Sequence, residues 1–170
     1  YAVLHHPAYR KKYELNLKRD FPRIPFYEDF FKWADWGKAL MALHIDYETV
    51  APFGLKTINA KEPKEQPKAK LKADKETGEI VLDENTTLSG VPAMAWQYKL
   101  GNRSALEWVL DQYKESKPKD PTIREKFNTY HFADYKKQVI DLLNRVCTVS
   151  VQTMDIINQM TSDEGMQKEL

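Results

Sequence analysis

The sequence predicts a mainly helical α+β fold, with long helices at both ends of the chain and a small antiparallel β-sheet in the middle. Apolar residues recur at three- and four-residue spacing in residues 1–50 and again in residues 101–161, which is typical of amphipathic helices. Residues 51–100 instead hold short strand-like runs separated by Pro and Gly, which predict a loop and a β-hairpin. We therefore expect one domain over residues 1–161 and a polar tail over residues 162–170.

The first block begins with Pro7, which fits the first turn of a helix because its missing N–H has no partner there. Three apolar residues follow at helical spacing: Tyr9, Tyr13 and Leu17. The proline-containing link over residues 21–25 ends this helix, and a long helix is expected from Tyr27 to about Tyr47. Gly37 inside the long helix costs up to about 1 kcal/mol relative to Ala, so we expect a neighbour to approach its backbone closely.

The middle block changes character. Charged residues and prolines without periodicity predict an exposed loop over Glu62–Lys68. Two strands, Ala69–Ala73 and Glu79–Leu82, are expected to flank a turn over Asp74–Gly78, whose glycine supplies a positive φ. The run Val91–Tyr98 is expected to add another strand, with its proline near the start, where a lost N–H donor matters least.

In the last block, Asp120 and Pro121 are a cap-and-start pair for a short helix through about Phe127. A long helix is expected from about Ala133 to Met160. Cys147 lies in its apolar run and, as the only cysteine, cannot form an internal disulfide, so we expect a buried thiol and a reducing compartment. No apolar run is long enough to span a membrane and no signal peptide is visible, so we expect a cytoplasmic protein without a membrane partner.

The stretch Tyr98–Tyr113 turns sharply from an apolar run into an amphipathic helix. Ser104 and Glu107 have the S-x-x-E spacing of a capping box, in which each side chain satisfies a backbone N–H of the other residue. Asn102 and Arg103 lie on the turn, beside a helix N-terminus whose free N–H groups favour anions such as phosphate. The residues alone favour the plainer interpretation, a well-capped scaffold helix with a surface arginine.

This stretch, together with Leu17–Glu48 and Asp120–Met154, resembles the C-terminal part of type ISP restriction-modification enzymes. Those are large single-chain bacterial proteins that carry a nuclease, an ATP-dependent DNA translocase, an adenine methyltransferase and a target recognition domain. The resemblance runs from about Tyr1 to Met154 and falls on the target recognition (specificity) domain. It implies a module that recognises double-stranded DNA, contacts the methyltransferase domain of the same parent chain, and directs adenine methylation and the coupled translocation and cleavage.

The resemblance implies no cofactor in this part of the chain, whereas the parent enzyme would use S-adenosylmethionine, ATP and Mg²⁺. Residues 51–85 match no signature of the family, so differences in the recognised sequence are expected there. Polar and aromatic residues of the types that contact bases or phosphates become DNA-binding candidates. The candidates are Lys56, Asn59, Lys61, Lys64, Lys68, Lys70, Lys72, Tyr98, Lys99, Asn102, Arg103 and Tyr130.

Two further expectations accompany these candidates. Lys68, Lys70 and Lys72 alternate, so they are expected to point to one side of a strand. Trp33 and Trp108 lie at helical spacing and are expected to pack between layers. Without the resemblance, an ordinary solvated loop and strand face is the better explanation of the lysines.

The formal net charge of +1 divides unevenly along the chain. Residues 1–72 contain 14 Lys and Arg against 9 Asp and Glu, whereas residues 73–170 contain 12 against 16. This modest basic excess predicts weak, salt-dependent attraction to DNA phosphates, which suits a module that reads bases within a larger DNA-gripping enzyme. The first residue is Tyr and residues 1–4 have the pattern of a helix end, so we expect the chain to be part of a longer protein.

Catalytic motifs are missing from all 170 residues. There is no G-x-x-x-x-G-K-[ST] loop, no glycine fingerprint for a dinucleotide or methyl donor, no Asn-Pro-Pro-aromatic tetrad and no serine nucleophile elbow. The histidines and the single cysteine form no metal-ligand pattern. An independent small enzyme is therefore disfavoured, and the remaining alternative to DNA reading is a helical docking module that positions domains or binds a protein partner.

Overall fold

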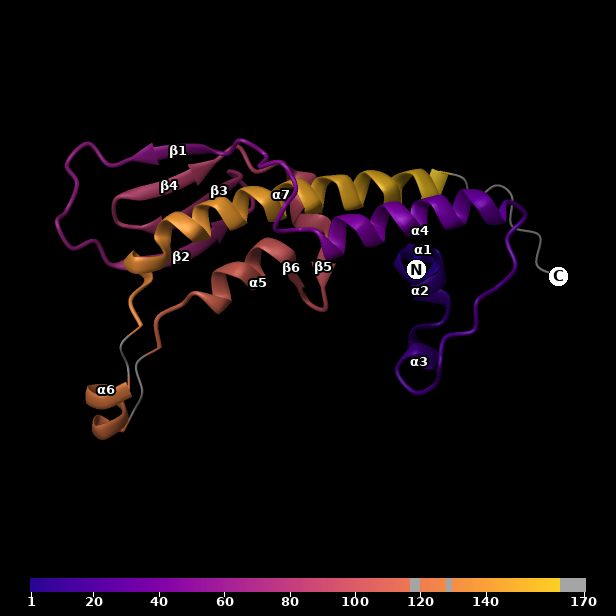
Figure 1. The fold of residues 1–170 in the computed structure, drawn as a ribbon, viewed down its shortest axis with the longest axis horizontal. Helices are drawn as coiled ribbons and strands as arrows, with labels where there is room; N and C mark the ends of the chain where they lie inside the picture. Colours follow the sequence, from indigo (N-terminus) through magenta and orange to yellow (C-terminus); the bar gives the residue numbers. More distant parts are fainter. Residues whose placement is uncertain (117–119, 128–129, 163–170) are drawn as a thin grey trace.

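The computed structural model describes residues 1–116, 120–127 and 130–162. Its elements in chain order are α1 (Ala2–His5), α2 (Pro7–Lys12), α3 (Glu14–Leu17), α4 (Phe30–Ile45), β1 (Lys56–Asn59), β2 (Ala69–Asp74), β3 (Glu79–Asp83), β4 (Thr86–Ser89), the 3₁₀ helix η1 (Ala93–Gln97), β5 (Lys99–Leu100), β6 (Arg103–Ser104), α5 (Ala105–Gln112), α6 (Pro121–Phe127) and α7 (Phe132–Ser162). Figure 1 shows a small sheet beside one end of the long α7, with α4 along the other end and α1–α3 below it. The expected fold class is confirmed.

The N-terminal block is helical but more broken than expected. The helix predicted to begin at Pro7 is divided into the two short helices α2 and α3, and a further short helix, α1, precedes it. The next helix, α4, begins at Phe30 instead of Tyr27, because Asp29 caps it: the Asp29 carboxylate accepts a hydrogen bond from the backbone N–H of Lys32 at 3.0 Å. α4 then ends at Ile45, two residues before the expected boundary.

α1 and α4 pack against the C-terminal half of α7 in a small apolar cluster. Leu40 of α4 and Ile157 and Met160 of α7 are buried there together with Ala2 of α1. Gly37 of α4 faces α1, and a Cβ built on it would lie 3.4 Å from the backbone nitrogen of Ala2. The expected close approach at this glycine is therefore confirmed.

The four-stranded sheet is antiparallel throughout, in the order β1-β4-β3-β2, so β1 and β2 are its two edges. The predicted hairpin is β2–β3, and Gly78 takes a φ of +69° in its turn. The sheet buries one face against α5 and α7 in the main core, which includes Leu71, Ile80, Leu82, Leu88, Leu106, Leu110, Val139 and Leu143. The opposite face carries only half-buried and exposed residues.

The strand expected over Val91–Tyr98 is wrong: residues Ala93–Gln97 form η1 instead. Pro92 has the fixed φ that suits the residue before a helical turn, and its carbonyl accepts a hydrogen bond from the N–H of Ala95 at 2.9 Å. The turn packs against α7 and buries Trp96. The burial of the Trp96 indole against α7 determines the local structure here. The alternation of apolar and polar residues in the sequence does not reveal this contact.

The C-terminal block follows the prediction closely. α7 spans Phe132–Ser162, and Cys147 is buried in it as expected. The Asp120 carboxylate accepts a hydrogen bond from the N–H of Thr122 at 2.8 Å, which confirms the cap of α6. Ser162 belongs to α7, and the rest of the expected tail lies outside the described residues. In the parts of the chain that the structure covers, no helix is long and apolar enough to cross a membrane.

The two tryptophans expected between layers differ. Trp33 is half-buried and stacks on Tyr27 with ring centroids 4.0 Å apart. Trp108 is 38% exposed, so the expectation is wrong for this residue. Leu106 and Leu110 point from α5 into the core. Trp108 lies midway between them in the sequence, so on a helix it points to the opposite side, toward solvent.

Candidate nucleic-acid interface

The first candidates lie on β1, at a free edge of the sheet. β1 pairs only with β4, with Lys56 opposite Ser89 and Asn59 opposite Thr86. Because directly opposed residues point to the same face, Lys56 shares the outer face with Ser89, whereas Asn59 shares the inner face with the buried Thr86. All four β1 residues are exposed, and so is Lys61 just beyond the strand.

The segment that leads into β1 is held by polar residues of α7. The Asn144 side-chain oxygen accepts hydrogen bonds from the N–H groups of Gly54 at 3.1 Å and Leu55 at 2.8 Å. The Thr148 hydroxyl donates to the carbonyl of Ala51 at 2.8 Å. Asn144 and Thr148 are both buried, so these bonds have little competition from water. The long helix therefore sets where β1 begins.

Lys64 and Lys68 lie in the loop between β1 and β2. The Lys64 ammonium is 2.7 Å from a carboxylate oxygen of Glu84, and the N–H of Lys68 donates to the other oxygen at 3.1 Å. The hydrogen bonds from Lys64 and Lys68 lower the pKa of Glu84. The Glu84 carboxylate thus ties the loop to the turn after β3, and the Lys64 ammonium already has an ion-pair partner within the protein.

A β-bulge interrupts the lysines of β2. Ala69 pairs with Asp83 and Lys72 with Val81, so three steps on β2 oppose two steps on β3. Leu71, inside this bulge, is buried and takes a φ of +44°. The extra residue disturbs the regular pairing at Leu71, but Lys68, Lys70 and Lys72 all remain exposed, so the expectation that they point to one side stays a prediction. Sequence spacing alone does not reveal a bulge.

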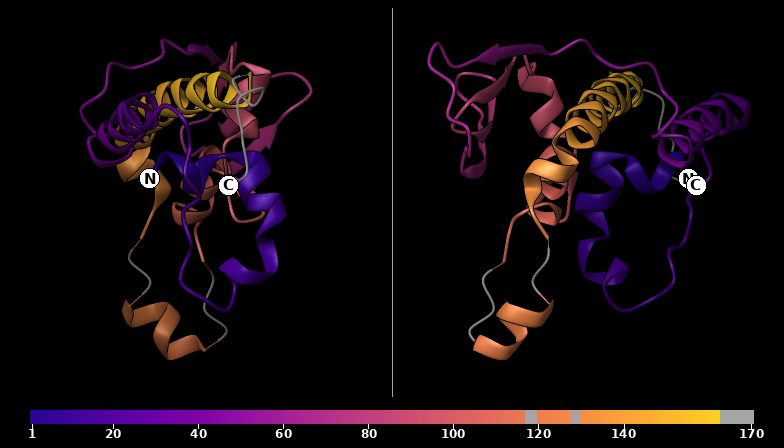
Figure 2. Two further views of the ribbon diagram at one scale, coloured as in Figure 1. Left: turned by 90° about the vertical axis from the view of Figure 1, so that its right-hand side faces the viewer. Right: turned by 60° about the vertical axis from the view of Figure 1, so that its left-hand side comes forward.

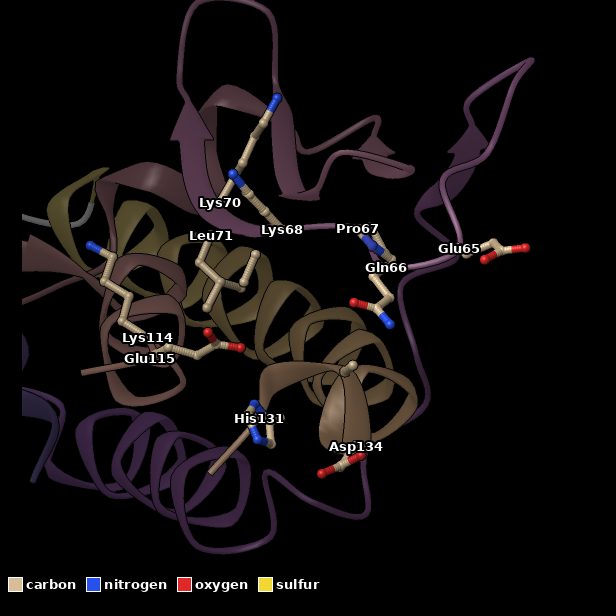
Figure 3. Close-up of a pocket in the computed structure, with 12 residues that line it drawn as sticks. Glu65, Gln66, Pro67, Lys68, Lys70, Leu71, Lys114, Glu115, His131 and Asp134 are labelled. Atoms are coloured by element: carbon tan, nitrogen blue, oxygen red, sulfur yellow. The ribbon is translucent and has the colours of Figure 1, made fainter. Parts of the chain in front are cut away.

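A groove of about 720 Å³ opens between β2, the end of α5 and the start of α7. Figure 3 shows Lys68 and Lys70 on the strand side of this groove, with Lys114, Glu115, His131 and Asp134 on the helix side. Lys114 and His131 were not among the candidates, because only the fold brings them near β2. The acids Glu65, Glu115 and Asp134 balance the three lysines, so the groove is polar but not strongly basic.

Lys99, Asn102 and Arg103 lie on a separate two-stranded hairpin, β5–β6. Lys99 pairs with Ser104, and Gly101 takes a φ of +71° at the turn. Lys99 and Asn102 are exposed. In the view of Figure 1 this hairpin lies below α7, whereas β1 lies above it.

The N-terminus of α5 is closed by its own capping box, which is confirmed. The Ser104 hydroxyl accepts the N–H of Glu107 at 3.3 Å, and the Glu107 carboxylate accepts the N–H of Ser104 at 2.8 Å. Partial burial raises the pKa of Glu107, but hydrogen bonds from Lys75 and Ser104 outweigh it and bring the pKa to about 2. Because a carboxylate already occupies this terminus, a phosphate would meet a like charge there.

Arg103 is engaged within the protein. Its guanidinium forms an ion pair with Asp111 and lies 5.8 Å from the centre of the Trp108 ring. The Trp108 indole N–H in turn donates to the carbonyl of Leu100 at 2.7 Å, which joins α5 to the hairpin. The Arg103 side chain stays 48% exposed, so a phosphate contact would compete with Asp111.

The two candidate tyrosines pack against neighbouring side chains. Tyr98 is half-buried and stacks on His44 with ring centroids 5.4 Å apart, beside an apolar pocket of about 730 Å³. The Tyr130 hydroxyl donates to the carbonyl of Tyr113 at 2.8 Å, and its ring stacks on Tyr135 at 5.3 Å. Burial raises the pKa of Tyr98. Both rings therefore hold elements of the fold together.

The histidine nearest these tyrosines is also part of the packing. The two ring nitrogens of His44 lie 2.6 Å from the Tyr1 hydroxyl and 3.0 Å from the Thr153 hydroxyl. Burial, together with the nearby His5, lowers the pKa of His44 to about 4. Among the residues that the structure describes, no three His, Cys, Asp or Glu side chains come together as metal ligands would.

The candidates thus fall on three surfaces. The β1 edge carries Lys56, Asn59 and Lys61; the β2 edge carries Lys68, Lys70 and Lys72; and the β5–β6 hairpin carries Lys99, Asn102 and Arg103. The segment from Lys56 to Lys72 is therefore divided between opposite edges of one sheet. Lys64, Tyr98 and Tyr130 have internal partners.

This arrangement is that of a known domain family. Residues 1–142 match the Type ISP C-terminal specificity domain, and because this match covers most of the chain, the protein belongs to that family. No curated protein sequence matches the chain.

Three solved structures share the fold. The cryo-EM structure of a DrdV–DNA complex superimposes with a TM-score of 0.86 at 59% identity and covers 94% of this chain. A nuclease-deletion mutant of the Type ISP restriction-modification enzyme LlaGI, in complex with a DNA substrate mimic, gives 0.71 at 30% identity. The ATP-dependent Type ISP enzyme LlaBIII, bound to DNA, gives 0.69 at 25%, and both of these matches cover 100% of this chain. The chain spans only 17%, 16% and 11% of the DrdV, LlaGI and LlaBIII chains, respectively.

Proposed function

We propose that this chain is the sequence-specific DNA recognition module of a type ISP-like restriction-modification enzyme. The observation that carries the proposal is that residues 1–142 belong to the specificity-domain family. The chain also closely resembles part of three proteins whose structures were determined in complex with DNA or a DNA mimic. The alternative, a docking module that does not touch bases, is less well supported because those relatives are DNA complexes.

In the parent enzyme the module would direct adenine methylation and the coupled ATP-dependent translocation and cleavage. Its protein partner would be the methyltransferase domain of the same chain. S-adenosylmethionine, ATP and Mg²⁺ would be bound by parts of the parent outside these residues, and the enzyme would act in the cytoplasm. Family membership supports this assignment, together with the structural likeness to LlaBIII, an ATP-dependent Type ISP restriction-modification enzyme.

Base reading fits the β1 edge best. Lys56, Asn59 and Lys61 are exposed, and within the described residues none of them takes part in an ion pair. Asparagine and lysine donate to base edges in the major groove. We assign Asn59 and Lys61 to base contacts. We assign Lys68 in the loop before β2, the exposed lysines of β2 and β5, Lys70, Lys72 and Lys99, and also Asn102, to phosphate contacts.

The test uses the full-length enzyme and a panel of duplexes, each carrying one single-base change in the methylation site. Asn59→Ala and Lys61→Ala should relax the preference at particular base pairs, because each good contact is worth about 1–3 kcal/mol of discrimination. Asn158→Ala, which removes an exposed asparagine from α7, is the matched control. If both β1-edge variants keep the wild-type profile at every position, the assignment of base reading to this edge is wrong.

A further inference from the structure

A second basic stretch of the chain lies outside all of the predicted site residues. Residues 1–23 contain six Lys and Arg against two Asp and Glu. Residues 56–72, which contain the candidate lysines, have six Lys against two Glu. The short N-terminal helices and the link that follows them therefore carry a basic excess as large as that of the candidate segment.

These cations lie on a defined structure, the α2–α3 arm, which we take as residues 7–23. Tyr9 is buried, and its hydroxyl donates to the carbonyl of Arg23 at 2.9 Å, so the end of the arm is tied back to α2. α2 also packs against α7. The arm is therefore fixed to the body of the domain and presents its side chains in a set direction.

Four cations of the arm are available to a ligand. Arg10, Lys11, Arg19 and Arg23 are exposed, and among the described residues none of them forms an ion pair. Lys18 differs, since it pairs with Glu14 at 2.7 Å. The helix dipole accounts for basic residues in the last turn of α2, but it does not account for Arg19 and Arg23, which lie beyond α3.

The arm projects from the same side of the α4–α7 layer as the β5–β6 hairpin. Figures 1 and 2 show α2, α3, the hairpin and α6 all below this layer. The pKa of Tyr98, which precedes Lys99, is raised by burial, and the positive charge of Arg10 partly offsets that rise. The charge of Arg10 therefore acts on the side chain of Tyr98, the residue immediately before the hairpin.

We propose that the α2–α3 arm is a second DNA contact and binds backbone phosphates through Arg10, Lys11, Arg19 and Arg23. This inference rests on the proposed DNA-recognition function. Phosphates have the same geometry in every sequence, so the arm adds affinity and orientation but no base preference. Together with Lys99 and Asn102 on the hairpin, it gives one side of the domain several separate points of phosphate contact.

The experiment measures equilibrium binding of the full-length enzyme to a duplex that contains its methylation site and to an unrelated duplex, at salt concentrations from about 50 to about 200 mM. Two double variants, Arg10→Gln/Lys11→Gln and Arg19→Gln/Arg23→Gln, remove two charges each. The slope of log K against log [salt] should become shallower by about 0.9 for each lost phosphate contact, equally for both duplexes. Lys38→Gln/Lys137→Gln removes the same charge from exposed positions of α4 and α7 and is expected to leave the slope unchanged.

The outcomes separate the two proposals. If the wild-type enzyme binds both duplexes equally, the recognition function fails, while the slopes of the arm variants still report on the phosphate contact. If the arm variants keep the wild-type slope, or change it no more than the control does, the arm does not bind phosphate. Loss of thermal stability with an unchanged slope would show that these side chains support the fold of the enzyme and do not bind DNA, and it would overturn the proposal.

Discussion

Ser104 and Glu107 hold the start of α5 through two reciprocal hydrogen bonds. Lys75, from the β2–β3 turn, adds an ion pair to Glu107 at 2.9 Å. The Glu107 carboxylate therefore connects the start of α5 to Ser104 of β6 and to Lys75 in the β2–β3 turn.

Ser104→Ala should destabilise the domain by about 1 kcal/mol, because it removes the acceptor for the N–H of Glu107. The measurement is urea denaturation followed by circular dichroism. Ser116→Ala is the control, since Ser116 lies exposed in the link after α5. Equal stability of the two variants would show that the cap contributes nothing.

The stability that depends on Glu107 should also depend on pH. Its pKa is about 2 in the folded protein, below the ordinary value of 4.5, so its ionised form stabilises the fold above that ordinary value. The contribution is lost as the pH falls toward the folded pKa. Glu107→Gln should therefore unfold more readily than wild type at pH 7, and the difference should shrink between about pH 5 and about pH 2. A difference that stays constant over this range would contradict the assigned pKa.

Local spacing was sufficient to predict the capping box and the Asp120 cap, because each depends on residues two or three positions apart. The ion pair of Arg103 with Asp111 and the outward position of Trp108 were not predicted. Both depend on how α5 lies against the hairpin. That orientation is set by packing against α7 and is not contained in a local pattern.

At the scale of elements, the position of β1 depends on a polar seam along α7. Asn144 replaces the missing sheet partners of the segment before β1 by accepting two backbone N–H groups. Nothing in the helical pattern marks Asn144 as special, because its partners are 89 and 90 residues away. The sequence nevertheless predicts α7 itself well. Apolar residues recur at helical spacing along this 31-residue helix, so single polar residues such as Asn144 do not obscure the helical pattern.

Asn144→Ala leaves the N–H groups of Gly54 and Leu55 without their acceptor. We expect a loss of about 1–3 kcal/mol in the free energy of unfolding, the usual cost of unsatisfied buried donors. The loss is measured by urea denaturation, with Asn158→Ala, an exposed position of α7, as the control. A loss no greater than that of the control would show that the seam does not hold β1.

The segment from Lys56 to Lys72 lies at both edges of the sheet and covers about half of residues 51–85, the stretch in which differences of specificity are expected. Exchange of this segment for its counterpart from another family member should change which single-base site variants the full-length enzyme methylates. An exchange of α6, Pro121–Phe127, serves as the control. If the segment exchange leaves the methylation profile untouched, base reading lies elsewhere and this segment is an ordinary solvated surface.

Two elements show why the sequence predicted only part of the interface. The bulge at Leu71 and the 3₁₀ helix η1 both replaced the regular strand geometry that residue types favoured. The bulge buries Leu71 while leaving Lys70 and Lys72 exposed, and η1 buries Trp96. In each case tertiary packing outweighed the local preference.

At the scale of the whole molecule, the chain combines a helical layer, a small sheet and several projections below the layer (Figure 2). The class of fold was predictable because helical periodicity dominates both ends of the chain. The division of the candidate residues among three surfaces was not predictable, since it follows from strand order. Strand order depends on pairing between segments far apart in the sequence.

The central claim is that this domain selects the DNA site for its enzyme. The most direct measurement replaces the corresponding domain of LlaGI, a family relative with 30% identity, by this chain and identifies the adenines that the chimera methylates by sequencing the modified DNA. If the chain is the recognition module, the chimera methylates a site different from that of LlaGI, and it is the site methylated by the native parent of this chain. A chimera that methylates efficiently and still selects the LlaGI site would contradict the account.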